Sequence, residues 1–253
     1  MRGILYDEIG RGYASVRRPD PRVAAAIHAA LTGFASVVNI GAGSGSYEPT
    51  DMDVIAVEPS AQMRAQRPVG AAGCLAGVAE RLPLDDASVD VAMAVNSDFH
   101  WSDRRAGIAE MLRVSRRRVV IVTVDATVSD EYWFLRDYLP ETREVFTPLS
   151  EVTSALPGDC VVASVPIPSD CSDGSVLAYW KRPAAFLDAG NTSPMAVFSR
   201  VSPARIVAAL TQLRADLETG AWQARNRELL DLDSFDVGQR LVVFDQQARP
   251  CRA

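Results

Sequence analysis

A glycine-rich loop and one acidic residue are the features of the sequence with the clearest chemical use. The apolar residues 37–40 (VVNI) lead directly into Gly41-Ala42-Gly43-Ser44-Gly45, and Glu58 ends a second apolar run 17 residues after Gly41. Glycines at such a turn permit positive φ angles and let the backbone approach a bound molecule closely. A carboxylate at the end of the next strand can accept hydrogen bonds from both hydroxyls of a ribose. An isolated Glu at a strand end is usually only a solvated charge, so the combination of loop and carboxylate predicts the nucleoside site.

The spacing of the glycines separates two kinds of nucleoside ligand. A dinucleotide-binding loop has the pattern GxGxxG, which would require a third glycine at position 46, where this chain has Ser46. The observed pattern is GxGxG. This form is typical of domains that bind S-adenosylmethionine, in which no pyrophosphate has to lie on the helix N-terminus.

The loop and the carboxylate must be positioned by a parallel sheet. Short apolar runs alternate with helical stretches from residue 37 onward, which is typical of an α/β fold with helices on both faces of the sheet. The expected strands are residues 37–41, 53–58, 73–77, 89–95, 118–124, 160–168 and 241–244. The expected helices are residues 20–31, 60–66 and 103–114, the first of them capped by Asp20 and begun by Pro21.

About 70 residues separate the last two expected strands, which is too long for a simple loop in a compact domain. We therefore expect a mostly helical insertion at 171–236 that acts as a substrate cap, with one helix capped by Ser202, running through Glu218 and ending at Gly220. The remaining divisions are an N-terminal lid and first helix at 1–36, a cofactor-binding domain at 37–170, and the last strand with a tail at 237–253.

Composition narrows the choice of partners. The chain has 253 residues, a formal net charge of -6 and a pI of about 5.0, which argues against nucleic acid as a partner. No apolar run approaches the roughly 20 residues of a membrane span, and the N-terminus lacks a signal peptide, so a cytoplasmic protein without membrane contact is expected. Four scattered cysteines and two histidines do not predict a metal site. The basic run at 116–118 is expected to be a solvated helix end.

Four segments in sequence carry a resemblance to a known family. VVNIGAGSGSYE, VIAVEPS, AERLPLDDASVDVAM and VNSDFHW resemble the class I S-adenosylmethionine-dependent methyltransferases, in particular the group that includes the ubiquinone and menaquinone C-methyltransferases. The resemblance implies a Rossmann-like, seven-stranded sheet with a helical cap inserted before the last strand. It also implies S-adenosyl-L-methionine as cofactor and transfer of a methyl group to oxygen, nitrogen or carbon of a small organic molecule, with natural-product tailoring favoured over core metabolism.

The same resemblance implies which residues contact the cofactor. They are Tyr13, Arg17, Gly41, Ala42, Gly43, Glu58, Pro59, Ser60, Met63, Ala79, Glu80 and Asn96. By this resemblance the glycine loop lies against the methionine part, Glu58 holds the ribose, and Arg17 is a partner for the cofactor carboxylate. The sequence departs from the family pattern at Asn39 and Val78, where acidic residues are usual. One negative charge near the cofactor ammonium is therefore missing, and the contact to the adenine amino group must come from another residue.

Few residues are placed to assist the chemistry itself. His100 and Asp98 follow the fourth expected strand, where His100 or, as the weaker candidate, Asp98 could act as general base. The alternative, that His100 only packs or hydrogen-bonds beside the cofactor, is favoured. Aromatic residues outside the main strands are candidates for a substrate pocket, with core packing as the alternative for each. They are Tyr132, Trp133, Tyr138, Tyr179 and Trp180.

Two other functions remain open at this point. A nicotinamide-dependent oxidoreductase could use the same kind of sheet, but Ser46 argues against it. A non-catalytic module that binds S-adenosylmethionine would be compatible with the departures at Asn39 and Val78. Neither the methyl acceptor nor the oligomeric state follows from the sequence.

Overall fold

Seven strands form one sheet with the order β3-β2-β1-β4-β5-β9-β6 in the computed structural model, which describes residues 6, 7, 10, 12–146, 148–192 and 195–246. The strands are β1 (Ser36–Ile40), β2 (Asp53–Val57), β3 (Cys74–Leu75), β4 (Val89–Val95), β5 (Ser115–Val124), β6 (Val161–Ser164) and β9 (Gln239–Asp245). Strands β1 to β5 pair in parallel, whereas β9 is antiparallel to both β5 and β6. The predicted seven-stranded α/β sheet is confirmed.

The helices are mostly short. The α-helices are α2 (Tyr13–Val16), α3 (Pro21–Ala29), α4 (Ala61–Arg64), α5 (Arg104–Val114), α6 (Ala126–Ser129), α7 (Ser150–Thr153), α8 (Ala189–Thr192), α9 (Pro203–Glu218) and α10 (Ala221–Arg225). The 3-10 turns are η1 (Asp98–His100), η3 (Pro140–Val145), η4 (Val176–Tyr179), η5 (Pro183–Leu187), η6 (Ala196–Arg200) and η7 (Arg227–Asp231), and η2 (Phe134–Tyr138) is a π-helical turn. The predicted starts of α3 and α9 are confirmed, because Asp20 and Ser202 accept hydrogen bonds from backbone N–H groups of the first turn.

Helices cover both faces of the sheet. Because successive residues of a strand point to opposite faces, neighbouring residues of one strand pack against different helices. Ile27 of α3 belongs to the buried cluster that contains Val37 of β1. Met111 of α5 belongs to a second buried cluster with the neighbouring Val38. This double cover explains why the central strands are almost continuously apolar, and it leaves the strand ends as the place for polar loops.

Two expectations for individual elements are wrong. The predicted strand 160–168 is split into β6 and β7 (Ile167–Pro168), and β7 pairs with β8 (Ser234–Phe235) in a separate two-stranded sheet. Pro166 between them has no N–H to give to a ladder. The basic run at 116–118 lies in β5 rather than at a helix end, where Arg116 pairs with Asp90 and Arg118 with Asp245.

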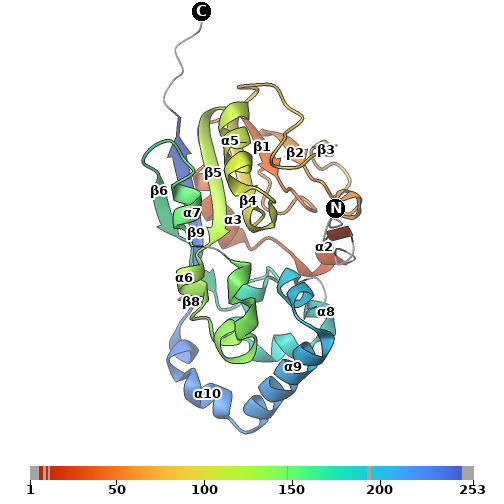
Figure 1. The fold of residues 1–253 in the computed structure, drawn as a ribbon, viewed down its shortest axis with the longest axis vertical. Helices are drawn as coiled ribbons and strands as arrows, with labels where there is room; N and C mark the ends of the chain where they lie inside the picture. Colours follow the sequence, from red (N-terminus) through yellow and green to blue (C-terminus); the bar gives the residue numbers. More distant parts are fainter. Residues whose placement is uncertain (1–5, 8–9, 11, 147, 193–194, 247–253) are drawn as a thin grey trace, which may run out of the picture.

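The residues between β6 and β9, 165–238, are called the connecting segment below. Figure 1 shows its helices α8, α9 and α10 beyond one end of the sheet, on the side where β5 ends and α6 begins. Most of its other elements are single helical turns. Within the ranges given above, no helix is long and apolar enough to cross a bilayer. Parts of the expected lid and tail, residues 1–5, 8, 9, 11 and 247–253, lie outside the described residues.

Candidate functional site

The loops that follow β1, β2, β4 and β5 meet at the carboxyl edge of the sheet, because these strands are parallel. This edge faces the connecting segment (Figure 1). The glycine loop, Glu58 and the segment from Asn96 to His100 therefore come together, as the sequence pattern predicts for a ligand site in an α/β sheet.

The glycine loop turns tightly away from β1. Gly41 and Gly43 have φ angles of 68° and 55°, in the region that favours glycine. A Cβ atom on Gly41 would lie 2.6 Å from the Cβ of Ser97, and one on Gly43 would lie 3.2 Å from the Cε of Met63. Position 41 therefore excludes any side chain, because the loop after β4 packs directly against it.

Glu58 connects this loop to the end of β2. Glu58 is 5% exposed, and its carboxylate accepts one hydrogen bond from the Gly43 N–H and one from the Ser60 N–H, each of 2.8 Å. Burial raises the pKa of Glu58, and the bonds from Ser60 and Gly43 oppose that shift. Each carboxylate oxygen has a second lone pair, so the group retains capacity to accept from two ligand hydroxyls.

Residues after Glu58 contact the N-terminal segment, which comprises the described residues 6, 7, 10 and 12–18, and join it to the same edge. Ser60 caps α4 by accepting from the Met63 N–H, and its hydroxyl donates to Asp7 over 2.6 Å. Gln66 donates to the Gly10 carbonyl oxygen over 2.6 Å. Ser60 and Met63 are buried beneath these contacts, and Pro59 is half-buried. The expected adenine-flanking residues are thus held together by the N-terminal segment.

Tyr13 and Arg17 belong to this N-terminal segment, but Arg17 already has a carboxylate partner from the chain itself. Its Nε and Nη2 donate to Asp173 over 2.5 and 3.2 Å, and its Nη1 donates to the Tyr13 hydroxyl over 2.9 Å. The Tyr47 hydroxyl donates to the same carboxylate over 2.9 Å. Burial disfavours the charged guanidinium, but Asp173 outweighs burial and holds the pKa of Arg17 well above its ordinary value.

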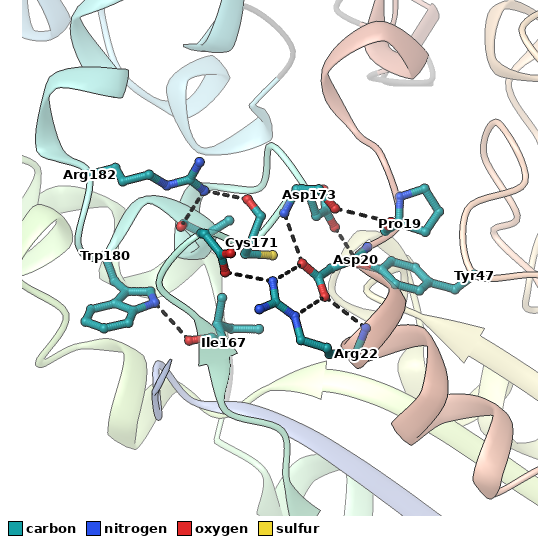
Figure 2. Close-up of polar contacts among 12 residues, drawn as sticks. Pro19, Asp20, Arg22, Tyr47, Ile167, Cys171, Asp173, Trp180 and Arg182 are labelled. Carbon is teal, nitrogen blue, oxygen red and sulfur yellow. Dashed lines mark hydrogen bonds and ion pairs between the residues drawn. The ribbon is translucent and has the colours of Figure 1, made fainter. Parts of the chain in front are cut away.

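Polar contacts between α3 and the connecting segment lie beside this ion pair. Figure 2 shows that Asp20 accepts from Arg22. Ser172 also donates its N–H to Asp20 over 3.1 Å. Arg22 also pairs with Asp170 over 2.8 Å. Charge-assisted hydrogen bonds therefore join α3 to the connecting segment at the carboxyl edge.

Asn96 stands at the end of β4 in an unusual conformation. Its φ angle is 50°, and its backbone N–H donates to the Val122 carbonyl oxygen over 2.8 Å. Its side-chain Oδ1 is buried and has no hydrogen-bond partner among the described residues. A buried acceptor without a partner costs free energy, so this atom is suited to a donor group of a ligand.

The two candidate bases are in different surroundings. Asp98 is buried, accepts from the Thr123 hydroxyl over 2.9 Å and lies 3.1 Å from the Arg104 guanidinium. Burial raises the pKa of Asp98, while Arg104 and Thr123 oppose the shift. These contacts favour a structural role for Asp98.

His100 contacts the N-terminal segment through Tyr6. The Tyr6 hydroxyl and His100 Nε2 are 3.2 Å apart, and the two rings meet edge to face. Burial, together with the positive charges of Arg200 and Arg17, lowers the pKa of His100 from 6.5 to about 4. The imidazole is consequently neutral near pH 7 and a weak base.

The remaining expected contacts lie on the β3 side of the edge. Ala79 is buried, and the Glu80 carboxylate accepts from the N–H groups of Ser102 and Asp103 over 2.6 and 3.1 Å. Glu80 therefore supports the loop that leads into α5. Val78, where the family pattern has an acidic residue, is 45% exposed.

Asn39 is the other departure from the family pattern. Its side-chain amide donates to Glu48 over 3.0 Å, and Glu48 forms a buried ion pair with Arg67 over 2.7 Å. A carboxylate is thus present near the glycine loop, although it comes from a different position and is neutralised by Arg67.

A cavity of about 60 Å³ lies between the carboxyl edge, the N-terminal segment and the connecting segment. Its apolar walls include Phe99, Val124, Phe146, Val176, Leu177 and Met195. Its polar lining residues are Tyr6, Arg17, Asn96, Ser175 and Gln239. The cavity is smaller than the roughly 300 Å³ or more of typical ligand pockets.

The aromatic residues that the sequence offered for a substrate pocket do not line this cavity. Tyr132, Trp133, Tyr138, Tyr179 and Trp180 are all buried in the main apolar cluster, so the packing alternative is confirmed for them. Tyr6 and Asp173 are the residues that sequence reasoning missed. Tyr6 lies in the polar, aromatic N-terminal segment, which is a usable signal, whereas nothing local marks Asp173.

No group of three or more His, Cys, Asp or Glu side chains within the described part of the chain could hold a metal ion. The arrangement instead offers a bare backbone loop, a buried carboxylate beside it and a mainly apolar cavity. These features suit a nucleoside ligand next to a small organic molecule.

Several known proteins are similar to this chain. Residues 38–123 match the family model described as methyltransferase domain. A solved structure of a candidate methyltransferase from an antibiotic biosynthesis pathway of Anabaena variabilis is 30% identical, with a TM-score of 0.84 over 91% of this chain and 99% of that chain. The YcgJ protein of Bacillus subtilis, 20% identical, matches 90% of this chain and 99% of its own with a TM-score of 0.54, which shows a shared fold.

Curated relatives match over a shorter stretch. Uncharacterised methyltransferases of Mycobacterium tuberculosis and Mycobacterium bovis are 41% identical over 88 residues. That stretch covers 32% of this chain and 35% of each relative, so about a third of their length is compared.

Proposed function

Because the chain belongs to the class I S-adenosylmethionine-dependent methyltransferases, we propose that it transfers a methyl group to an oxygen, nitrogen or carbon atom of a small organic molecule. The observation that carries the proposal is the buried Glu58 carboxylate, hydrogen-bonded to the Gly43 N–H at the edge of the sheet. A natural-product acceptor is supported by the description of the Anabaena relative, which is assigned to an antibiotic pathway.

The residues at the carboxyl edge fit S-adenosyl-L-methionine. The backbone of Gly41, Ala42 and Gly43, with its positive φ angles at the two glycines, would lie against the methionine part, and Glu58 retains lone pairs for two ribose hydroxyls. The unpartnered Oδ1 of Asn96 is an additional acceptor for the ammonium group.

The other expected contacts complete this proposed site. Pro59, Ser60 and Met63 would flank the adenine, with Ala79 and Glu80 toward its edge. Tyr13 and Arg17 would close over the cofactor from the N-terminal segment. Of the five N–H donors of a guanidinium, Arg17 uses three on Asp173 and Tyr13, which leaves two for a cofactor carboxylate.

When bound, S-adenosylmethionine supplies a methyl group that is already activated by its sulfonium. The chain then has to align the acceptor with that methyl group and exclude water. The walls formed by Phe99, Val124 and Phe146 serve the exclusion of water. We propose that His100 orients the Tyr6 hydroxyl toward the acceptor, because Tyr6 lines the cavity and His100 contacts its hydroxyl.

Titration calorimetry with S-adenosylhomocysteine tests this function. We expect binding of one molecule per chain and a raised melting temperature, since a ligand that binds only the folded state stabilises it. NADH serves as the control ligand and should produce neither effect. Binding of NADH without binding of S-adenosylhomocysteine would favour the oxidoreductase, whereas tight binding with no methylated product from a broad acceptor panel would favour a non-catalytic module.

A further inference from the structure

The charge of the acceptor can be inferred from the groups that face the cavity. Arg17 is the one charged residue among the described residues that line it. The other polar lining residues, Tyr6, Asn96, Ser175 and Gln239, carry hydroxyl or amide groups. Most of the remaining wall is apolar.

The charge of Arg17 is already neutralised inside the protein. Asp173 accepts two of its N–H groups, and the Arg17 and Asp173 side chains are only 17% and 7% exposed. A backbone bridge between the same two residues fixes the pair, and Gly174 donates its N–H to the Val16 carbonyl oxygen over 3.1 Å. A Cβ on Gly174 would lie 2.3 Å from Val16 Cγ1, so the two strands of chain are in close contact.

Tyr6 in the cavity wall and His100, which contacts its hydroxyl, are both uncharged near pH 7. Burial raises the pKa of the Tyr6 hydroxyl, so it stays protonated. Burial and the charges of Arg200 and Arg17 lower the pKa of His100 to about 4, so it stays neutral. Neither residue supplies a counter-charge to a ligand.

The two N–H groups of Arg17 that Asp173 and Tyr13 leave are assigned above to the cofactor carboxylate, so none remains for an acceptor. A charged acceptor would therefore lose its hydration in this cavity without gaining an opposite charge. We infer that the acceptor is an uncharged, mainly apolar molecule, and that the Arg17–Asp173 pair is what excludes anionic acceptors. This inference rests on the proposed methyltransferase function, because it concerns the molecule that lies beside the cofactor.

Three single-ring probes of the same shape test the inference: benzamide, benzoate and benzamidine, which are neutral, anionic and cationic near pH 7. Their affinities would be measured by ligand-observed NMR on the full chain saturated with S-adenosylhomocysteine. We expect benzamide to bind at least about tenfold more tightly than either charged probe. Equal or tighter binding of benzoate or benzamidine would overturn the inference, as would failure of benzamide to bind up to its solubility limit.

Asp173→Asn sharpens the test by removing the neutralising charge while keeping the shape of the side chain. The affinity for benzoate relative to benzamide should rise by about tenfold, because the site then has one negative charge fewer beside Arg17. Asp170→Asn is the matched control, since Asp170 is 77% exposed and pairs with Arg22 rather than with a residue of the cavity wall. An unchanged ratio in the Asp173 variant, or an equal change in both variants, would contradict the role given to the pair.

Failure of the proposed function and failure of the inference about the acceptor give different results. If the wild-type chain does not bind S-adenosylhomocysteine, the methyltransferase proposal fails before any probe is added. If it binds and the probes rank by charge in the opposite order, only the acceptor class is wrong. A melting curve of each variant verifies that it is folded, and the wild-type ranking decides the inference even if Asp173→Asn unfolds.

Discussion

The carboxyl edge of the sheet and the connecting segment are stabilised by different kinds of contact. At the edge, backbone groups dominate: Gly41 and Gly43 have positive φ angles, and Glu58 accepts from two backbone N–H groups. In the connecting segment and the turns packed on it, aromatic rings dominate. Phe134 of η2 and Phe186 of η5 stack with centroids 3.6 Å apart and planes within 4°.

This difference separates ligand binding from folding. A backbone loop with a buried carboxylate positions ligand atoms but buries little apolar surface, whereas large rings contribute most of the stability of the region they fill. Substitutions of ligand-facing side chains at the edge should therefore change cofactor affinity more than stability, and substitutions among the rings should do the reverse. A Cβ added to Gly41 is the exception, because it would clash with Ser97 inside the protein. The predictions below test this separation, starting with the largest expected effect.

Phe134→Ala should lower the free energy of unfolding by about 3 to 5 kcal/mol, because it leaves a cavity opposite Phe186. Urea titration followed by fluorescence would measure this. Val207→Ala on α9 is the control, since Val207 is 65% exposed and should cost less than about 0.5 kcal/mol. Folded Phe134→Ala protein should bind S-adenosylhomocysteine as the wild type does, and an affinity loss as large as the stability loss would break the separation.

His100 lies where the two regions meet the N-terminal segment, facing Tyr6, Phe99, Arg17 and Arg200. Its pKa is lowered from 6.5 to about 4 in the folded chain, so between these values the unfolded chain binds more protons. The free energy of unfolding therefore keeps its full value with respect to His100 above about pH 6.5. It falls by about 3 kcal/mol as the pH is lowered toward 4, because the buried imidazole resists protonation.

Stability curves of wild type and His100→Gln from pH 7 to 4 would measure this term. Because carboxylates also titrate in this range, the difference between the two curves isolates the histidine. Parallel curves would mean that His100 is more open to solvent than its contacts imply.

Glu58→Gln should weaken S-adenosylhomocysteine binding by about 1.5 to 3 kcal/mol, or roughly 10- to 150-fold. Both carboxylate oxygens accept from N–H groups, so the amide NH₂ of Gln would have to face a donor. Glu151→Gln is the matched control on an exposed glutamate, which pairs with Arg104. Titration calorimetry compares the two, and equal affinities would remove Glu58 from the site.

Gly41→Ala should cost about 1 to 3 kcal/mol of stability beyond the cost of Gly33→Ala. Both glycines have positive φ angles, 68° and 86°, but a Cβ at position 33 meets nothing within 4 Å, whereas at position 41 it meets Ser97. Thermal melts of the two variants separate the cost of the contact with Ser97 from the cost of a side chain at a positive φ angle. Equal melting temperatures would show that the loop after β4 yields easily.

Much of the edge was predictable, because its signals are local. Strands buried on both faces must be apolar throughout, which marks β1, β2, β4 and β5 in the sequence, and Asp20 and Ser202 mark helix starts through their capping preference. The placement of Gly41 near Glu58 follows from a parallel sheet, because the carboxyl ends of its strands share one edge, whereas the strand order was not predicted. The break at Pro166 had a local signal as well, since proline gives no N–H to a ladder.

The sequence by itself thus determined the sheet, the glycine loop and the carboxylate beside it, since each depends on backbone geometry within one element or on the edge that parallel strands share. Only the tertiary structure decided that Arg17 pairs with Asp173, 156 residues away, and that Tyr6 meets His100, 94 residues away. It also decided which aromatic residues line the cavity: Phe99 and Phe146 do, whereas Trp133 and Trp180 pack in the main apolar cluster. These outcomes depend on how separate elements pack, and no local pattern of residues encodes that packing.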